Sequence, residues 1–458
     1  MIMPTVLKFG GTSVADAHAF ENVAEIVRER TQLVPVVVVS AMSGVTDALL
    51  MSTSIALQNG AGAALNSLEA TFIRHTTTAR ELLSNPAVYL GQIDEAKKQI
   101  SDYLKLITIQ PAQLRALQDQ ILAFGETLSC LLLAALLNER GVRAVAINAR
   151  DCIITDDEHG CASPLMDETF AATRSIVLPF LETEYVAVLG GFIGSNKKSQ
   201  TTTLGRGGSD YTATIVGAAL NAREIQIWTD VTGVLTADPR VVPEAQTVER
   251  LSYAEAAELA YFGAKVLHPK TIQPAIEDCI PVRICNSRAP AEVGTLVCAQ
   301  TETTPRTLKA IAHKRGVTTV QITSARMLGA YGFLRALFEV FERHRTVVDV
   351  VTTSEVSVSL SLDDASSLPS IVVELEKLGT VRIEQDRAII CVVGEGLHGT
   401  PGIAARVFST ISDINVTLIS QGASSINFTF AIEEQRVNEA VSRLHAAFFE
   451  ERAVSVAN

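Results

Sequence analysis

Residues 5–13 read TVLKFGGTS, and this stretch decides the fold. Thr5–Phe9 is a short run of mostly apolar and β-branched residues, typical of a buried strand, and it ends at the pair Gly10-Gly11. Apolar residues recur at helical spacing from Phe20 onward. A buried strand that passes through a glycine turn into a helix predicts an α/β unit, so we expect a sheet covered by helices.

The same arrangement recurs along the first 290 residues. Three more buried runs, at 35–40, 185–189 and 224–228, are each followed by small or polar residues. Residues 112–140 predict one long helix with Glu126 near its middle. Because ligands bind beyond the carboxyl ends of parallel strands, we expect a three-layer α/β sandwich with a central, mostly parallel sheet and a ligand site at one edge.

Beyond residue 306 the chain repeats itself. Residues 327–363 align with residues 397–433 at a constant offset of 70, which places Gly332 on Gly402 and Phe338 on Phe408 without a gap. Each copy predicts a glycine turn, a helix and two strands. We therefore expect two small α+β units of βαββ type after the first 290 residues and the linker.

The composition narrows the class of protein. The chain has 458 residues, 47% hydrophobic and 19% charged, which is typical of a globular protein of more than one domain. A net charge of −12 disfavours nucleic acid and anionic membranes as partners. The apolar runs are too short to span a bilayer, no secretory signal is recognised, and the seven scattered cysteines predict buried thiols, so a cytoplasmic location is expected.

Phosphoryl transfer to a carboxylate would explain the glycine and lysine motifs. Such an acceptor is already ionised at pH 7, so catalysis needs positioning and positive charge and no general base. Lys8 beside Gly10-Gly11, and the second glycine loop before Asp210, supply these features. Each motif alone has a simpler interpretation: a glycine pair is usually a turn, Asp210 could be a plain helix N-cap, and Glu126 could be a surface acid.

The motifs together resemble one family. KFGGTSVAD, SAMSGVTD, FGET, GGFIG, TTTLGRGGSDYTA, WTDVTGVLTADPR and FGAKVLHPKT occur in this order and are similar to the aspartokinases, and the C-terminal repeats resemble their paired ACT domains. TTSEVSV is shared with the lysine-sensitive type. The resemblance implies phosphorylation of L-aspartate to 4-phospho-L-aspartate by ATP with Mg²⁺, which is the first step of lysine, threonine and methionine biosynthesis.

The resemblance also implies roles for residues of the amino-terminal half. It makes Lys8 and Asp210 the catalytic pair, and it implies that Glu126 receives the substrate's α-amino group while Arg206 binds a carboxylate. The full expected set is: substrate at Ser40, Thr46, Glu126 and Arg206; nucleotide at Lys8, Gly10, Gly11, Ser209, Thr229, Asp230, Leu235, Arg240 and Lys265; and no dedicated protein metal site. Leu235 departs from the family, which has tyrosine there.

For the C-terminal half, the resemblance implies an amino-acid effector, lysine before threonine, at the ACT interface. The acids Asp349 and Glu355 suit an effector with extra positive charge, whereas Ala330 and Val347 replace hydroxyl residues of the lysine-sensitive relatives. The expected effector site comprises Met327, Ala330, Phe333, Leu334, Val347, Val348, Asp349, Ser354 and Glu355.

The expected domains follow the same resemblance. They are a catalytic domain at 1–290, a linker at 291–306, and ACT domains at 307–386 and 387–458, with a strand near 308–312 able to pair into the second. A homodimer or a dimer of dimers through the ACT domains is implied. Two alternatives stay open at this point: a kinase of another amino-acid carboxylate, and an amino-acid sensor without catalytic activity.

Overall fold

The computed structural model describes residues 2–263, 267, 269–299, 308–422 and 424–450. The chain forms two compact units that are not continuous in sequence. Unit 1 comprises residues 1–234, 249–253 and 266–300, and unit 2 comprises residues 235–248, 254–265 and 301–458. Residues 235–248 and 254–265, which precede the expected linker, therefore pack with the C-terminal repeats.

Unit 1 is built on an eight-stranded sheet with the order β3-β5-β2-β1-β8-β10-β11-β9. All neighbours are parallel except β10 and β11. The strands are β1 Thr5–Phe9, β2 Pro35–Val39, β3 Ala144–Ile147, β5 Val186–Gly190, β8 Glu224–Thr229, β9 Arg250–Ser252, β10 Val282–Asn286 and β11 Thr295–Cys298. The prediction of a central, mostly parallel sheet is confirmed.

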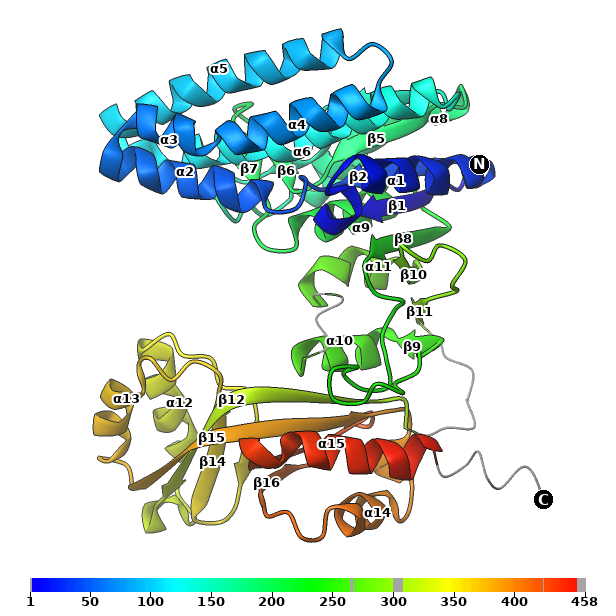
Figure 1. The fold of residues 1–458 in the computed structure, drawn as a ribbon. Helices are drawn as coiled ribbons and strands as arrows, with labels where there is room; N and C mark the ends of the chain where they lie inside the picture. The colour runs from blue at the N-terminus through cyan, green and yellow to red at the C-terminus, as the bar shows by residue number, and fades with distance from the viewer. Residues whose placement is uncertain (1, 264–266, 268, 300–307, 423, 451–458) are drawn as a thin grey trace, which may run out of the picture. The chain divides into compact units, whose positions relative to one another are not determined.

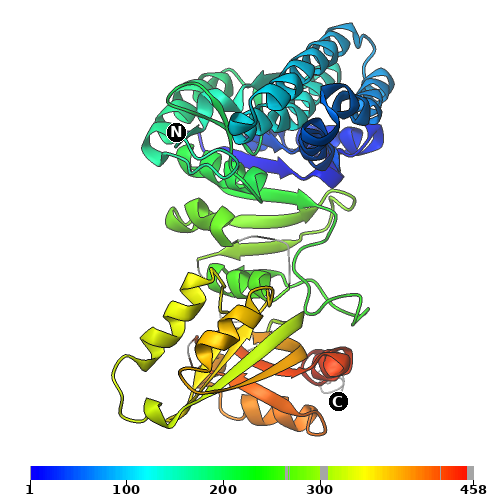
Figure 2. The same ribbon diagram turned by 90° about the vertical axis from the view of Figure 1, so that its left-hand side faces the viewer.

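Helices cover both faces of this sheet. The helix α6 packs on β2, β3 and β5, and α9 packs on β1, β2 and β8 from the other side. Figure 2 shows α2, α5 and α6, coloured blue to cyan, gathered on one side of the sheet. The helices are α1 Ala17–Glu29, α2 Val45–Asn59, α3 Ala61–Ser67, α4 Glu69–Leu82, α5 Ala87–Ile109, α6 Leu114–Glu139, α7 Ala149–Cys152, α8 Met166–Glu182, α9 Gly208–Ala219 and α11 Gln273–Glu277. The helix α10 Tyr253–Tyr261 belongs to unit 2 except for its first residue.

The helix at Pro111–Glu139 is the core helix of unit 1. By length and composition it could span a membrane, but 72% of its most apolar window is buried inside the protein. Its side chains join those of β1 and β2 in one apolar cluster that includes Leu7, Phe9, Val37 and Val39. Burial identifies this segment as a core helix, which agrees with the expectation drawn from the short apolar runs.

A small second sheet lies in unit 1 beside the long helix. It contains β4 Ile154–Thr155, β6 Ile193–Asn196 and β7 Thr201–Thr203, in the order β4-β6-β7. The strand β7 contacts α6 and leads directly into the glycine loop before α9. This sheet therefore connects the long helix to that loop.

Unit 2 contains one six-stranded antiparallel sheet with the order β13-β14-β12-β15-β17-β16 (Figure 1). Its strands are β12 Ala310–Thr323, β13 Val351–Thr353, β14 Ser357–Leu362, β15 Thr380–Val393, β16 Val416–Ser420 and β17 Asn427–Glu433. Its helices are α12 Phe333–Arg343, α13 Leu368–Leu375, α14 Ile403–Thr410 and α15 Val437–His445. One apolar cluster joins α12 and α13 to β12 and β14, and another joins α14 and α15 to β15 and β17.

The predicted repeat is present in unit 2. Gly332 and Gly402 cap α12 and α14 with φ values of 81° and 83°, a backbone conformation that favours glycine. In each copy the helix is followed by an antiparallel pair of strands, β13 with β14 and β16 with β17. Residues 310–314 of β12 pair with residues 389–393 of β15, which pairs in turn with β17.

Three local expectations differ from the structure. Residues 295–298, expected in a linker, form β11, in which the alternate side chains of Thr295 and Val297 are buried in the main sheet, while residues 300–307 lie outside the described residues. Asp210 is the third residue of α9, whose N-cap is Gly207, so Asp210 is not the N-cap. All seven cysteines are free thiols; Cys161 and Cys279 are exposed on turns and Cys298 is half-buried, so only four are buried.

Candidate active site

The predicted catalytic pair meets at the carboxyl end of β1. The Lys8 ammonium lies 2.6 Å from a carboxylate oxygen of Asp210, and both side chains are largely buried, with exposed fractions of 11% and 19%. Lys8 lies on β1, in the middle of the sheet, and Asp210 lies in the first turn of α9. An acid is favoured near a helix N-terminus, so the start of α9 is a suitable place for Asp210 beside the lysine.

The first glycine turn keeps the space above β1 open. A Cβ atom at Gly10 would lie 3.6 Å from the Lys8 ammonium, and one at Gly11 would lie 3.0 Å from the Ala41 carbonyl oxygen. The Gly10 N–H donates to the Trp228 carbonyl oxygen at 3.2 Å. Gly10 therefore ties β1 to β8 and leaves room for a ligand beside Lys8, and its own amide is already used.

The second glycine loop leads from β7 into α9. Gly205 and Gly207 have φ values of 73° and 75°, which a residue with a side chain adopts at a cost. Between them Arg206 is exposed. At Gly191 a Cβ atom would lie 2.6 Å from Cβ of Ser209, so this glycine lets the start of α9 approach the end of β5. The predicted Ser209 is thus adjacent to the carboxyl end of β5.

Glu126 is buried in the middle of α6 against Gly190, at the end of β5. A Cβ atom at Gly190 would lie 3.1 Å from Cβ of Glu126, so helix and strand can approach this closely only at glycine. Among the described residues, its Oε2 atom has no hydrogen-bond partner. Burial raises the pKa of Glu126 to about 8. A buried carboxyl group with a free oxygen is a receptor for a cationic donor.

The two other predicted substrate residues lie beyond β2. The Ser40 N–H donates to the Phe9 carbonyl oxygen at 3.0 Å, which places Ser40 at the strand end next to β1. Thr46 is the second residue of α2, whose N-cap is Gly44. Both side chains are half-buried. The ends of β5, β2, β1 and β8 are thus adjacent in the sheet; β2, β1 and β8 carry predicted site residues, and the end of β5 contacts Glu126.

The predicted nucleotide residues divide between the units. Thr229 and Asp230 follow β8 in unit 1, and the Thr229 hydroxyl donates to the Asp230 carboxylate at 3.2 Å. Leu235 and Arg240 belong to unit 2, where Arg240 is exposed and donates to both carboxylate oxygens of Asp238. Lys265 lies outside the described residues.

The predicted effector residues lie around the start of α12 and the edge of the unit 2 sheet. Asp349 is the most constrained of them: its side chain accepts a hydrogen bond from the Tyr261 hydroxyl, and Lys314 lies 3.9 Å away. Burial and the neighbouring Asp363 raise the pKa of Asp349 to about 7. The other members are more accessible, and Glu355 is exposed.

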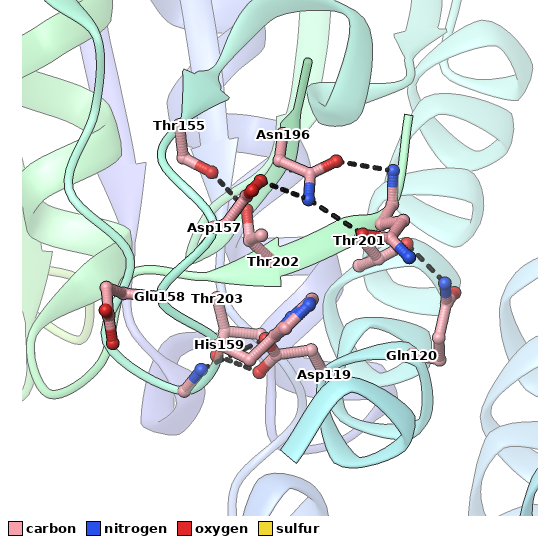
Figure 3. A network of polar contacts seen from close by, with 12 residues as sticks. Asp119, Gln120, Thr155, Asp157, Glu158, His159, Asn196, Thr201, Thr202 and Thr203 are labelled. Atoms are coloured by element: carbon pink, nitrogen blue, oxygen red, sulfur yellow. Dashed lines mark hydrogen bonds and ion pairs between the residues drawn. The ribbon is translucent and has the colours of Figure 1, made fainter. Parts of the chain in front are cut away.

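One polar cluster was not predicted from the sequence. Asp119 on α6 is fully buried and is bonded to His159 and Thr203 (Figure 3). An acid within an otherwise apolar helical stretch is the only sequence signal for it, and this signal does not identify its partners.

Comparison with known proteins agrees with this geometry. A family model described as the amino acid kinase family matches residues 3–286, and one described as an ACT domain matches residues 390–448. The fold, the Lys8–Asp210 pair and the two glycine loops thus define an amino-acid kinase joined to an ACT region.

Relatives with known activity narrow the class. Lysine-sensitive aspartokinase 3 of Escherichia coli is 39% identical over 97% of this chain and 99% of its own length. Aspartokinase 1, chloroplastic, of Arabidopsis thaliana is 39% identical over 97% of this chain and 80% of its own. This chain belongs to the aspartokinase family and is an aspartate kinase, so the predictions of family and enzyme class are confirmed.

Two solved structures share the whole fold. They are E. coli aspartokinase III in complex with aspartate and ADP (R-state), at 37% identity, and the same enzyme in complex with lysine and aspartate (T-state), at 38% identity. Each has a TM-score of 0.82 and covers 98% of this chain and 100% of its own. The predicted fold class is confirmed.

Proposed function

We propose that this chain transfers the γ-phosphoryl group of ATP to the side-chain carboxylate of L-aspartate, with Glu126 and Arg206 holding the substrate. The product would be 4-phospho-L-aspartate, at the head of lysine, threonine and methionine biosynthesis. Glu126 is the observation that carries this assignment, because a buried carboxyl group with an unpaired oxygen fits the α-ammonium group of an amino acid.

The two ends of the substrate would be bound by different structural elements. Glu126 on α6 would pair with the α-ammonium group, and the exposed guanidinium of Arg206, on the loop before α9, would bind a carboxylate through two parallel hydrogen bonds. The side-chain carboxylate of aspartate is then free to face Lys8. A substrate longer by one methylene would place that carboxylate differently, which favours aspartate over glutamate.

The residues around Lys8 account for the chemistry. The acceptor is ionised at pH 7, so no base is needed, and the main barrier is the repulsion between two negative groups. The Lys8 ammonium would offset the charge on the transferring phosphoryl group. Asp210, 2.6 Å from Lys8, would hold that ammonium group in place. Pre-aligned charge of this kind acts in the transition state without having to reorganise.

The nucleotide would lie along the glycine turns and the end of β8. Gly10 and Gly11 leave the space beside Lys8 open, and Ser209 and the N-terminus of α9 offer N–H donors for phosphate oxygens. The described residues contain no group of three or more His, Cys, Asp or Glu side chains arranged to hold a metal ion. Mg²⁺ would therefore be carried by the nucleotide phosphates, where it supplies further neutralising charge.

An acceptor panel tests the assignment. ADP release is measured with L-aspartate, L-glutamate and N-acetylglutamate, each at several concentrations with saturating MgATP. We expect kcat/KM for aspartate to exceed that for glutamate by at least about 100-fold, since misplacing the reacting group has an effect of this size. Equal turnover of glutamate would point to another amino-acid kinase, and no turnover of any acceptor would leave the sensor alternative.

Feedback inhibition by lysine is proposed for unit 2. Asp349 and Glu355, which flank β13, would bind the two ammonium groups of lysine, and E. coli aspartokinase III was solved in complex with lysine and aspartate in its T-state. The coupling free energy between lysine binding and substrate binding would be roughly 1 to 3 kcal/mol. Inhibition curves with lysine, threonine and both together test it, and a stronger effect of threonine would reverse the assignment.

Assembly and location are proposed on similar grounds. Leu334, Val347 and Val351, beside the edge strand β13, are exposed apolar residues that a second copy would cover, so we expect a homodimer through the ACT region or a dimer of such dimers. The most apolar helix is buried in the core, so a soluble enzyme in the cytoplasm is expected. Light scattering of the purified protein would give the mass of the assembly.

A further inference from the structure

A buried acid lies seven residues before Glu126 on the same helix. Asp119 has no exposed surface, and seven residues are close to two helical turns, so Asp119 and Glu126 face the same way about 10 Å apart along α6. Asp119 belongs to none of the predicted binding sites. A fully buried carboxyl group is costly, so its place in the structure needs another explanation.

The carboxyl group of Asp119 takes part in three hydrogen bonds. The Thr203 hydroxyl donates to Oδ1 at 2.5 Å, and the His159 Nδ1 and the Gly160 N–H reach Oδ2 at 2.8 and 3.0 Å (Figure 3). Burial raises the pKa of Asp119, and these hydrogen bonds oppose that rise. The imidazole ring of His159 is mostly covered, with 17% of its surface exposed. Both oxygens of the Asp119 carboxyl group therefore have hydrogen-bond partners.

These partners lie on both sides of the loop that carries Arg206. Thr203 is the last residue of β7, and the loop begins immediately after it. Gly160 and Cys161 lie under Gly205, where an added Cβ atom would be 3.4 Å from the Gly160 carbonyl oxygen and 3.2 Å from the Cys161 sulfur. One carboxyl group on α6 thus holds the strand that enters the loop and the turn on which the loop rests.

The rest of β7 is held at a greater distance from the loop. The Thr201 hydroxyl donates to Gln120 at 2.9 Å, and the Thr202 hydroxyl is 2.7 Å from that of Thr155. Three consecutive buried threonines therefore have three different partners. Only the last of them, Thr203, is bonded to Asp119 and adjoins the arginine loop.

We propose that Asp119 and His159 are positioning residues that set the distance between Glu126 and Arg206, and with it the affinity for the amino-acid substrate. This inference rests on the proposed roles of Glu126 and Arg206. Gly205 and Gly207 give the loop many accessible conformations. The Asp119 cluster selects one of them in advance, so the two ends of the substrate meet their partners without a further ordering cost.

The test separates the two substrates kinetically. Steady-state constants for aspartate and for ATP are measured for Asp119→Asn, His159→Ala, His159→Asn and the control Gln120→Ala. We expect Asp119→Asn and His159→Ala to raise KM for aspartate roughly 10-fold or more, with KM for ATP changed less than about twofold. His159→Asn retains an N–H donor near the position of Nδ1 and should recover most of the loss.

A control variant and the results that would contradict the proposal complete the test. Gln120→Ala removes the neighbouring contact to Thr201 and should change KM for aspartate less than about twofold. Parallel changes in both KM values, or His159→Asn no better than His159→Ala, would reduce the cluster to a structural role and overturn the proposal. Thermal melting checks the fold, and if Asp119→Asn does not melt cooperatively, the two His159 variants decide.

The wild-type enzyme in the same assay separates this proposal from the proposed function. If the wild type phosphorylates another amino acid in place of aspartate, the assignment of substrate fails, while the ratio of variant to wild-type KM for that amino acid still tests the positioning role. If aspartate is phosphorylated and the ratio is near one, only the positioning role fails.

Discussion

Each unit of this protein contains a buried acid with a raised pKa, and the two acids differ in their surroundings. Glu126 in unit 1 has a pKa near 8 because it is buried, and its Oε2 has no partner among the described residues. Asp349 in unit 2 has a pKa near 7 because of burial and of Asp363, and it is bonded to Tyr261. Each acid thus has one oxygen without a hydrogen-bond partner among the described residues, but Asp349 in addition accepts from the Tyr261 hydroxyl and lies 3.9 Å from Lys314.

This difference indicates how each unit would respond to an amino acid. In unit 1 the substrate ammonium would gain an ion pair without breaking a protein contact. In unit 2 an effector ammonium would have to compete with the Tyr261 hydroxyl and with Lys314, which is paired to Asp363. An effector at Asp349 would therefore compete with existing contacts, whereas a substrate at Glu126 would displace a proton.

The largest effect, on kcat, is expected from removing the Lys8 ammonium group, which is already in place. Lys8→Ala removes the ammonium group that lies 2.6 Å from Asp210, and kcat should fall on the order of 1,000-fold. The rate of ADP release measures it. Circular dichroism should show an unchanged fold, and a variant that keeps ordinary kcat would remove Lys8 from the catalytic role.

The next effect concerns the unpartnered acid. Glu126→Gln keeps the size of the side chain but cannot form an ion pair, so KM for aspartate should rise about 100-fold, as for loss of one partner of a buried charge pair. KM for ATP serves as the internal control and should stay within about twofold. An unchanged KM for aspartate would show that the ammonium group binds elsewhere.

A pH series sharpens the same point. Below its pKa of about 8, free Glu126 holds a proton that must leave before an ammonium group can pair with it. KM for aspartate should therefore fall as pH rises toward 8, by up to about tenfold per unit, and then level. Glu126→Gln should flatten this dependence, and a KM that rises with pH in this window would contradict the assignment.

The same raised pKa has the opposite effect on the stability of the unliganded protein. A carboxyl group with a folded-state pKa above its ordinary value stabilises the fold fully below that ordinary value, and this contribution is lost as pH rises through about 8. Between about pH 4.5 and 8, Glu126→Gln should therefore show a smaller loss of melting temperature than the wild type.

The smallest effect tests the regulatory acid. Tyr261→Phe removes the hydroxyl that competes for Asp349, and one hydrogen bond is typically equivalent to a few-fold change in affinity, so half-inhibition by lysine should need about fivefold less lysine. Glu355→Ala should shift inhibition in the other direction, because it removes an effector contact. If lysine inhibits both variants at the same concentration as the wild type, the effector binds elsewhere.

Much of the architecture was predictable from local patterns. The strand at Thr5–Phe9, the long helix around Glu126 and the repeat that aligns Gly332 with Gly402 all follow from periodicity and glycine placement, and the structure contains them. The pairing of Lys8 with Asp210 was expected only through the family resemblance. These residues are 202 positions apart, and no spacing rule joins them.

Other features could not be predicted because they depend on packing between distant segments. The partners of Asp119 lie 40 and 84 residues away in sequence, on a turn and on a short strand. The exposed thiols of Cys161 and Cys279 and the strand β11 also depend on where the chain folds back. A pattern within one segment carries no information about which other segment covers it.

The sequence by itself determined the order of the elements, the glycine turns and the family, because these depend on residue types within short stretches. The tertiary structure alone decided which acids are buried, which are paired and which titrate near neutral pH. Burial and pairing are sums over neighbours from several elements, so Glu126, Asp119 and Asp349 acquire their different properties only when the chain has folded.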